Sequence, residues 1–484
     1  MRRRDIEWSA PSISRRQVFA GLAGLAMSTL PVRYGLAGSA PGEAARSGPR
    51  EILLTVSAAN RHFWTDAGPA TGVLAYSDQV PGPVLRVKQG QPLRVTVRNR
   101  LDEDTTVHWH GIRLPNAMDG VPGLTQPPIR SGEQFVYEFS PPDAGTFWYH
   151  PHSNTLQQQG RGLAGALIVE EDSPPPVDRD ILWVLTDWRL DDGRQIAGGF
   201  GNAMEAGMAG RIGSLVSING SFSREEAFHD GETVRLRLIN TSLARIMRLD
   251  FSRYDPIVIA VDGQPCDPFV PVDGRVVLGP AMRIDLILTM SGKPGNRYAV
   301  RDDFYPALSY DLTDFVCIDT TGRKRAPVNI GQFSLPRNPL PEPELATATR
   351  IEITLQGGMM GGMGGMMGMA SSSAVWAING SSMTGDGQAG MPPLATLERH
   401  KAYLLSISNA TAWWHPMHLH GLSFLVISRN GENVPNRQWA DTVLLAPQDV
   451  VEVAFVADNP GDWMFHCHVI DHQKSGLMTV LRIT

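Results

Sequence analysis

Histidine and cysteine side chains gather in four short segments of this 484-residue chain. Of the 13 histidines, only His62, His229 and His400 lie outside them. The four segments are His108-Trp109-His110, His150-Pro151-His152, His415-Pro416-Met417-His418-Leu419-His420 and His466-Cys467-His468-Val469-Ile470-Asp471-His472. Imidazole and thiolate groups are ligands that suit copper, so these segments are candidate metal sites.

The segment around Cys467 has the most informative spacing. If it is a β-strand, alternate side chains point to opposite faces. Cys467 would then face one metal, while His466 and His468 face others across a short piece of backbone. A single His-x-His pair is commonly an ordinary polar pair on a strand. Four such pairs, one of them split by a cysteine, indicate metal binding and a path for electrons.

Zinc is the alternative metal for a site rich in cysteine and histidine. Structural zinc sites are closed tetrahedral sets that usually contain several cysteines. The chain has three cysteines in all, and only Cys467 lies among the histidines. This composition favours copper. Cys266 and Cys317 could form a disulfide, but each is more simply interpreted as a small buried residue.

The ordered set of four motifs resembles the copper-binding motifs of the three-domain multicopper oxidases, which include laccases, ascorbate oxidase and copper-efflux oxidases. The resemblance runs from about Glu51 to Thr484 and implies an enzyme with four copper ions. It assigns His415, Cys467 and His472 to a type 1 copper and His108 and His418 to a type 2 copper. Two type 3 coppers take the remaining ligands, which are His110, His150, His152, His420, His466 and His468. The implied reaction is one-electron oxidation at the type 1 copper, transfer through Cys467 to His466 and His468, and four-electron reduction of dioxygen to water.

Two positions near the type 1 motif depart from the family pattern. Efflux oxidases have a methionine five residues after the last histidine, where this chain has Leu477. Losing a weak axial ligand raises the potential of such a copper. A small shift would instead bring Met478 to the axial position. The family also has an acid directly after that histidine, and here it is Gln473, which cannot carry a proton in the same way.

Asp119, nine residues after His110, matches an acid that the family uses near its three-copper cluster. A carboxylate there can relay protons, so Asp119 is a candidate catalytic residue. The alternative is a turn aspartate, because Asp119-Gly120 is a turn dipeptide.

Residues 357–369 consist only of glycine and methionine. The methionines are Met359, Met360, Met363, Met366, Met367 and Met369. Thioethers select Cu(I), so the run is a candidate Cu(I) site. A flexible surface loop whose methionines adapt to nearby apolar surface is the alternative. Thr411 and Trp413 count against a cuprous substrate, because efflux oxidases have an acid and a methionine at these positions.

The elements that must hold these ligands are strands. Short runs rich in Val, Ile, Leu and Thr alternate with Gly, Pro and Asp turns, which is typical of all-β sandwiches. Pro-rich stretches near residues 173–176 and 335–343 divide the chain. We expect a leader over residues 1–45 and three consecutive cupredoxin-like Greek-key β-sandwich domains over 46–172, 173–340 and 341–484. These three ranges are called the first, middle and third segments.

The three segments also align with one another, as expected of a repeated fold. Runs ending in Asn99, Asn240 and Asn409 correspond. Nine and eleven residues later come His108 and His110 in the first segment, Leu249 and Phe251 in the middle one, and His418 and His420 in the third. The outer segments should therefore share a metal cluster. The middle segment, with no copper ligand, should act as a spacer and substrate wall.

The N-terminus resembles an export signal. Arg15-Arg16 precedes a mildly apolar run over residues 20–30, too short to span a membrane as a helix in the mature protein. Paired arginines before a weakly apolar, Gly/Ala-rich segment match a twin-arginine signal, and an ordinary secretory leader is the alternative. The sequence thus predicts a periplasmic protein that uses the twin-arginine export machinery and has no stable membrane insertion. The net charge of −6 and the absence of a basic run argue against nucleic-acid binding.

The leading hypothesis is a laccase-like multicopper oxidase that couples oxidation of phenols, aromatic amines or Cu(I) to reduction of dioxygen. A dedicated cuprous oxidase for copper tolerance is the alternative within the family. A different class is a non-catalytic periplasmic scaffold of the same fold.

Overall fold

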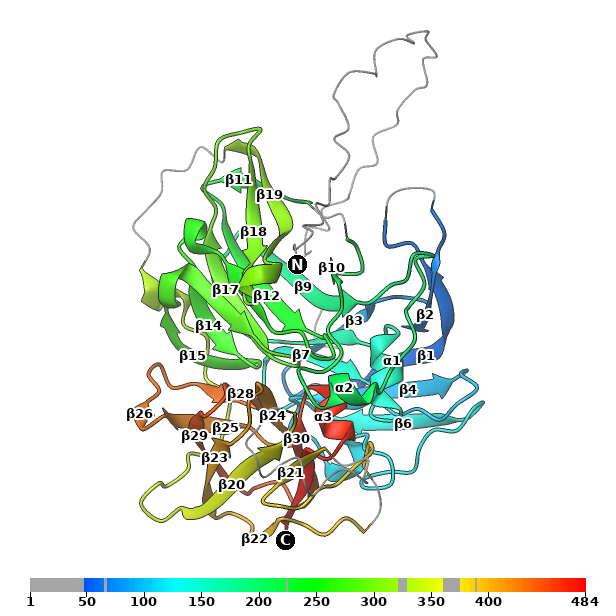
Figure 1. Cartoon of the computed structure of the whole chain (residues 1–484). Coiled ribbons are helices and arrows are strands. Elements are labelled where there is room, and N and C mark those ends of the chain that lie inside the picture. Colours follow the sequence, from blue (N-terminus) through cyan, green and yellow to red (C-terminus); the bar gives the residue numbers. More distant parts are fainter. Residues whose placement is uncertain (1–47, 65–67, 223–224, 321–328, 360–374, 388–389) are drawn as a thin grey trace, which may run out of the picture. The chain divides into compact units, whose positions relative to one another are not determined.

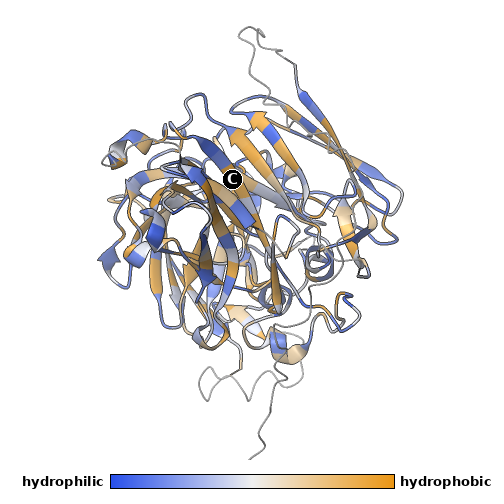
Figure 2. Ribbon diagram, turned by 90° about the horizontal axis from the view of Figure 1, so that it is seen from above, coloured by the Kyte–Doolittle hydropathy of each residue, from blue (hydrophilic) through white to orange (hydrophobic). Residues whose placement is uncertain are grey.

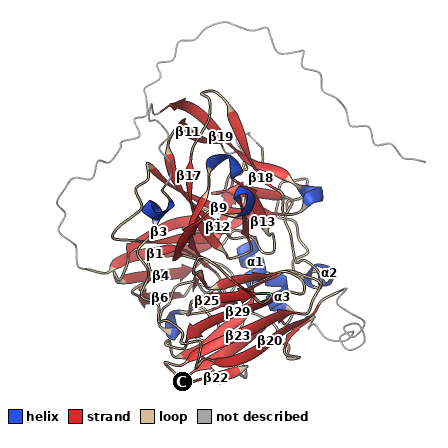
Figure 3. Cartoon of the chain, turned by 90° about the vertical axis from the view of Figure 1, so that its left-hand side faces the viewer, coloured by secondary structure: helices blue, strands red, loops and turns tan. Residues whose placement is uncertain are grey.

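Strands are by far the most common regular element, as the all-β prediction requires (Figure 3). The computed structural model describes residues 48–484 except 65–67, 223–224, 321–328, 360–374 and 388–389. The α-helices are short: α1 (Thr155–Gly160), α2 (Ala203–Ala206) and α3 (Ile470–Lys474). Among the described residues, no helix combines the length and apolar character needed to cross a membrane. The expected export signal, residues 1–45, lies outside the described part of the chain.

Two four-stranded sheets come from the first segment (Figure 1, blue to cyan). In spatial order, one consists of β2 (Thr71–Tyr76), β1 (Arg50–Arg61), β4 (Leu93–Asn99) and β6 (Gln134–Phe139), and the other of β3 (Gly82–Lys88), β8 (Gly165–Glu170), β7 (Gly145–His150) and β5 (His108–His110). β5 and β7 are antiparallel and pair His108 with His150. This register brings two of the four histidine motifs side by side.

Two larger sheets come from the middle segment. One consists of β10 (Leu215–Ile218), β9 (Arg179–Trp188), β12 (Thr233–Asn240), β17 (Arg283–Thr289), β14 (Ile257–Val261) and β15 (Gln264–Phe269), and the other of β11 (Glu225–Asp230), β19 (Tyr310–Thr320), β18 (Arg297–Asp302), β13 (Met247–Asp250) and β16 (Arg275–Leu278). β12, β15 and β17 contact β7 of the first segment.

The third segment forms the last two sheets (Figure 1, yellow to red). One consists of β21 (Trp376–Ile378), β20 (Thr349–Gly357), β23 (Ala402–Asn409), β29 (Val450–Val456), β25 (Phe424–Arg429) and β26 (Glu432–Asn433), with β27 (Trp439–Ala440) beside β25, and the other of β22 (Ala395–Leu397), β31 (Met478–Ile483), β30 (Gly461–Cys467), β24 (His415–Leu419) and β28 (Thr442–Leu445). β24 and β30 pair His418 with His466. The third and fourth histidine motifs therefore meet as the first and second do.

The predicted repeat is visible in the pairing. In each segment, the strand that ends in the aligned asparagine pairs in parallel with an earlier strand: β4 with β1, β12 with β9, and β23 with β20. The Pro-rich stretches lie between the sheet pairs and contain no strand. Residues Gly48–Thr484 form one compact unit, so the domain boundaries at 172 and 340 stay predictions.

The three asparagines explain why these strands end alike. Asn99, Asn240 and Asn409 are buried. In each, Oδ1 accepts a bond from the backbone N–H two residues on, and Nδ2 donates to carbonyls of the following loop and of a distant turn. A buried amide satisfied in this way fixes the chain's exit from the strand. That exit determines where the downstream histidine motif begins.

The core lies between the paired sheets. Hydrophobic residues alternate with polar ones along many strands (Figure 2), as in β3 and β4. The strands that carry the histidines differ, because β5, β7 and β24 are buried at every position. All three cysteines are free and buried. Cys266 and Cys317 are therefore small buried residues, as expected, and do not form a disulfide.

Candidate metal centre

His415, Cys467 and His472 meet in one buried trio. His415 begins β24, Cys467 ends β30, and His472 lies on α3. Cys467 Sγ is 3.5 Å from His415 Nδ1 and 3.7 Å from His472 Nδ1, and the two nitrogens are 3.1 Å apart. Nitrogen and sulfur ligands bind a metal at about 2.0–2.3 Å, which places them roughly 3–4 Å from one another. The trio therefore fits one metal ion.

Neighbouring groups turn both Nδ1 atoms of the trio toward the sulfur. Thr411 Oγ1 is 2.8 Å from His415 Nε2, and His472 Nε2 donates to the Met208 carbonyl at 2.7 Å. The backbone N–H of Val469 donates to Cys467 Sγ at 3.4 Å. Such contacts on the far ring nitrogen set the tautomer and ring orientation of metal-binding histidines. The sequence analysis missed this role for Thr411 and Met208.

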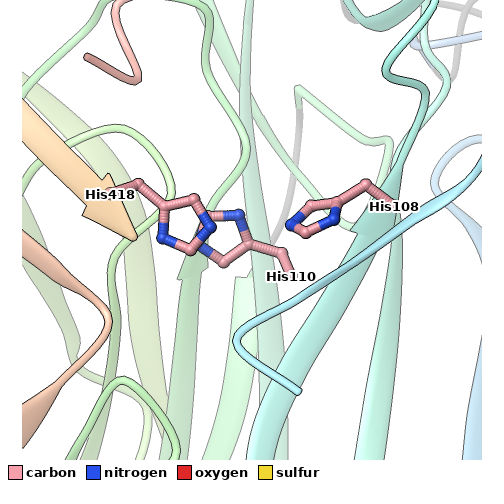
Figure 4. Close-up of side chains that lie close together, drawn as sticks. All are labelled: His108, His110 and His418. Atoms are coloured by element: carbon pink, nitrogen blue, oxygen red, sulfur yellow. The ribbon is translucent and has the colours of Figure 1, made fainter. Parts of the chain in front are cut away.

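The eight other motif histidines form a second, larger cluster. Their donor atoms fall into three groups whose members lie within 4.8 Å of one another: His108, His110 and His418; His110, His150 and His468; and His152, His420 and His466. Figure 4 shows the rings of His110 and His418 facing one another, with His108 beside them. Every group combines residues of the first and third segments. The structure thus brings together all the histidines that the sequence analysis selected.

The ring nitrogens of this cluster fit metal binding. The buried Nε2 atoms of His108, His150, His152 and His418 have no hydrogen-bond partner among the described residues. The Nδ1 atom of each of these rings instead contacts a backbone carbonyl. Nδ1 therefore carries the hydrogen, and Nε2 keeps a lone pair with nothing in the described chain to accept it. Nε2 of His420 and of His466 are only 3.0 Å apart, which also suits a shared partner that accepts lone pairs.

Burial sets the protonation state of these ligands. It lowers the pKa of His150 and His466 well below the usual value, and neighbouring histidines lower it further. Burial lowers the pKa of His472 to about 3 and raises the pKa of the Cys467 thiol. At neutral pH the imidazoles of His150, His466 and His472 are therefore uncharged and ready to coordinate, while the thiol must lose a proton when a metal binds.

Asp119 lies against the histidine cluster, as the sequence analysis expected. Its Oδ2 is 2.9 Å from His420 Nδ1, and its Oδ1 is 3.3 Å from His108 Nδ1. Asp119 also follows a short 3-10 helix, so it has the turn position of the alternative interpretation as well. Gln473 is 1% exposed, and its amide has no hydrogen-bond partner in the described chain. The catalytic role of Asp119 stays a prediction.

Leu477 and Met478 face different surroundings. Leu477 is fully buried, and its carbonyl accepts the Cys467 N–H at 3.0 Å. Met478 pairs across the strands with His466 and packs with Met464 in a separate cluster. Directly paired residues of neighbouring strands share one face. Met478 therefore lies on the His466 face, while Cys467 points to the other, which favours Leu477 as the axial residue.

A second buried acid touches the cluster and was missed. Asp441 Oδ1 is 3.1 Å from His110 Nε2 and 3.3 Å from His418 Nδ1. Burial alone would raise the pKa of Asp441, but the guanidinium of Arg283 holds it below its usual range. A signal was present in the sequence, because Asp441-Thr442 interrupts an otherwise apolar run from Trp439 to Leu445. Only the fold shows which ring the carboxylate contacts.

Met359 is the one methionine of the Gly/Met run that the structure describes. Its N–H donates to Gly207 O at 2.6 Å, and its carbonyl accepts the Trp413 Nε1–H at 2.8 Å. The run therefore begins next to Met208, the carbonyl partner of His472. Met360, Met363, Met366, Met367 and Met369 lie outside the described residues.

A cavity of about 520 Å³ is lined in part by residues that adjoin the His415–Cys467–His472 trio. Its wall includes Phe304, Tyr305, Trp413, Trp414, Ala209 and Val469. Trp414 precedes His415, Ala209 follows Met208, and Val469 donates to the sulfur of Cys467. The cavity thus reaches the backbone that directly surrounds all three members of the trio.

Comparison with known proteins decides the family. Models of the multicopper oxidase family match residues 57–174 and 367–484. A solved multicopper oxidase from Pseudomonas thermotolerans is 33% identical, with a TM-score of 0.80, over 90% of this chain and 99% of that one. The chain belongs to the multicopper oxidase family.

Other multicopper oxidases are similar over most of their length. Multicopper oxidase MmcO of Mycobacterium tuberculosis is 28% identical over 86% of this chain and 84% of that protein. A laccase-like multicopper oxidase of Ochrobactrum is 25% identical, with a TM-score of 0.74, over 90% of this chain and 99% of that one. As a multicopper oxidase, the chain is an oxidoreductase of cupredoxin-like fold. The family implies copper cofactors, a small-molecule or metal reductant, and dioxygen.

Proposed function

We propose that this multicopper oxidase is laccase-like and oxidises small aromatic reductants, such as phenols or aromatic amines, while reducing dioxygen to water. The observation that carries the proposal is the cavity with aromatic residues in its wall, next to the backbone around the trio. Phe304 and Trp414 meet edge to face, with ring centroids 5.3 Å apart, and such surfaces bind aromatic rings by offset or edge contacts. The similar Ochrobactrum enzyme has oxidase activity towards lignin model compounds, which supports the same substrate class.

In this proposal the chain binds four coppers. His415, Cys467 and His472 hold type 1, His108 and His418 hold type 2, and the six remaining motif histidines hold the type 3 pair. When bound, copper supplies one-electron redox chemistry at the trio and dioxygen reduction at the larger cluster. Copper analysis, the visible spectrum and the electron paramagnetic resonance (EPR) spectrum test the assignment. Fewer than four ions per fully loaded chain would contradict it.

The protein's own groups bind the reductant, orient the ligands and deliver protons. The cavity holds the ring of the reductant and excludes water, and Met208 O keeps the His472 imidazole oriented. His466 and His468 adjoin Cys467 in the backbone, which gives a covalent path from the trio to the cluster. Asp119 Oδ2, beside His420 Nδ1, is placed to hold and deliver protons.

Substitution of Ala412, which is exposed at the rim of the cavity, tests the proposal. Ala412→Phe narrows the cavity without touching the trio, so we expect the KM for 2,6-dimethoxyphenol to rise at least several-fold with unchanged visible absorption. Ala58→Phe is the matched control, because Ala58 is an exposed alanine that lines a separate hollow. An unchanged KM in Ala412→Phe, or an equal rise in the control, would contradict the role of the cavity.

Oxidation of Cu(I), as in a dedicated oxidase for copper tolerance, is the second candidate function. It is favoured by two methionines near His472, because thioethers select Cu(I). The carbonyl of Met208 accepts a hydrogen bond from His472 Nε2, and the N–H of Met359 donates to the neighbouring Gly207 carbonyl. Met208→Leu combined with Met359→Leu nearly conserves volume. The double variant should lose Cu(I) oxidation more than phenol oxidation, as measured by oxygen uptake. An equal loss of Cu(I) oxidation and phenol oxidation would show that these methionines serve only in packing.

We further propose that the mature enzyme works in the periplasm after twin-arginine export. Arg15-Arg16 and the weakly apolar run that follows support this location. Fractionation of cells that produce Arg15→Lys/Arg16→Lys tests it. The variant should accumulate in the cytoplasm, and normal export would point to an ordinary secretory leader.

A further inference from the structure

Arg283 is a fully buried arginine at the start of β17 in the middle segment. Its guanidinium uses all five N–H donors. Nε donates to Thr146 O of the first segment, and the remaining four go to Ala281 O, Asp262 O and the two oxygens of Asp441. A guanidinium with every donor engaged has one orientation. Arg283 thereby joins backbone or carboxylate groups of all three segments.

Asp441 connects this arginine to the metal cluster. Arg283 donates from Nη1 to Oδ1 at 2.9 Å and from Nη2 to Oδ2 at 2.5 Å. Oδ1 also accepts a bond from the Thr442 hydroxyl at 2.8 Å and lies 3.1 Å from His110 Nε2. When the hydrogen of His110 is on Nε2, Nδ1 has a free lone pair that can bind a metal. The structure agrees with this, because His110 Nδ1 is buried and has no hydrogen-bond partner in the described chain.

The middle segment holds Asp441 from both sides. Asp262 Oδ1 accepts the backbone N–H of Arg283 at 2.9 Å, and its Oδ2 accepts that of Thr442 at 3.0 Å. Gly111 leaves room for the arrangement, because a Cβ there would collide with Arg283 Nη2 and Asp441 Oδ2. A glycine directly after His110 is what lets an ion pair pack against that ring.

We propose that Arg283 is a positioning residue for the three-copper site. It fixes the Asp441 carboxylate so that Oδ1 keeps the hydrogen of His110 on Nε2 and directs Nδ1 to the metal. A buried carboxylate without a partner is strongly unfavourable and would turn to other donors or lose its charge. The middle segment therefore shapes the metal site although it supplies no ligand.

The first test uses metal-free protein, so that it is independent of copper and of activity. Long-range ¹H–¹⁵N spectra of histidine-labelled protein report which nitrogen of His110 carries the hydrogen. We expect the Nε2–H form in the wild type and its loss in Arg283→Met. Arg283→Lys keeps the positive charge but cannot make the bidentate contact with Asp441. This variant should show a mixture of the Nε2–H and Nδ1–H forms of His110. If the methionine variant does not fold, the lysine variant provides the test.

The matched control is Arg235→Met. Arg235 is equally buried, and its guanidinium is paired with Asp285 and Glu171 rather than with an acid that contacts a metal-site histidine. The control should lose stability while keeping the wild-type form of His110. An unchanged His110 in both Arg283 variants, or the same change in the control, would overturn the proposal and leave Arg283 a fold anchor only.

The second test uses copper-loaded protein and rests on the proposed function. Loss of a residue that orients a ligand weakens metal binding by about 10–100-fold. In Arg283→Lys, copper should leave the larger cluster at lower chelator concentration and the type 2 EPR signal should change, while type 1 absorption and the KM for phenol stay the same. Unchanged copper retention and EPR would contradict the proposal. A wild-type protein that binds no copper would instead overturn the proposed function, and the metal-free test would still decide the role of Arg283.

Discussion

At the scale of residues, the proposed type 1 site combines three strong ligand candidates with a leucine. His415, Cys467 and His472 are fully buried and lie 3.1–3.7 Å apart. Leu477 is buried and its carbonyl accepts the Cys467 N–H, whereas Met478 packs with Met464. Because leucine has no donor atom, the copper would lack the weak axial ligand that lowers the potential of related sites.

We predict that Leu477→Met lowers the reduction potential of the type 1 copper. A thioether sulfur stabilises Cu(II) more than a leucine side chain does, and the packing cost of the swap should stay below about 1.5 kcal/mol. A fall of about 30 mV in this one-electron couple corresponds to about 0.7 kcal/mol, scaled from the two-electron relation, and is measurable by redox titration. Met478→Leu is the control and should leave the potential unchanged. The reverse result would make Met478 the axial residue.

At the scale of elements, each histidine motif depends on the loop that leads into it. Asn409 holds the end of β23 through Thr411 N and the carbonyls of Trp413 and Ala446. The Thr411 hydroxyl then contacts His415. Asn240 makes the equivalent bonds at the end of β12, but the loop after it leads to no metal ligand.

This repeat supplies an internal control. Asn409→Ala should destabilise the protein by about 1–3 kcal/mol, because it leaves buried backbone groups without partners. It should also alter the visible spectrum, since the Thr411–His415 contact loses its support. Asn240→Ala should cost a similar amount in urea unfolding and leave the spectrum unchanged. If the spectrum changed only in Asn240→Ala, or in neither variant, the loop after Asn409 would have no role in orienting His415.

At the scale of the whole molecule, the buried histidines couple stability to pH. Burial lowers the pKa of His472 to about 3, against 6.5 for an exposed histidine. Between these values the folded chain binds fewer protons than the unfolded chain, so the free energy of unfolding rises with pH. This stabilisation is complete above pH 6.5 and is lost as the pH falls through the window toward 3.

We therefore predict that the metal-free protein is less stable at pH 5 than at pH 7. His472 alone should account for about 2 kcal/mol, at about 1.4 kcal/mol per pH unit below 6.5. Urea unfolding of the wild type and of His472→Gln at several pH values measures the effect, and the variant should show a shallower slope. Parallel slopes in the two proteins would mean that His472 titrates normally in the folded chain.

Much of the site follows from local sequence. In a strand, residues two apart share a face and neighbours oppose one another. The His-Cys-His motif therefore already places Cys467 on one face and His466 and His468 on the other, which separates two candidate metal sites. The repeat after Asn99, Asn240 and Asn409 likewise follows from the sequence, because equivalent loops need equivalent asparagines. The all-β fold class and the meeting of the histidine motifs were predicted from such patterns, whereas the position of Asp119 beside the cluster was predicted from the resemblance to the family.

What only the tertiary structure decided are contacts between residues far apart in the chain. His110 and Asp441 are separated by 331 positions, and Arg283 and Asp441 by 158. No local periodicity relates such residues. The sequence assigned the middle segment only a spacer and wall role, because it has no histidine at the aligned ligand positions. The aromatic cavity and the side of the strand that Leu477 faces have the same origin. The cavity and the orientation of Leu477 depend on how strands from separate sheets pack. The spacing of the candidate ligands within each motif, in contrast, depends on backbone geometry over two to five residues.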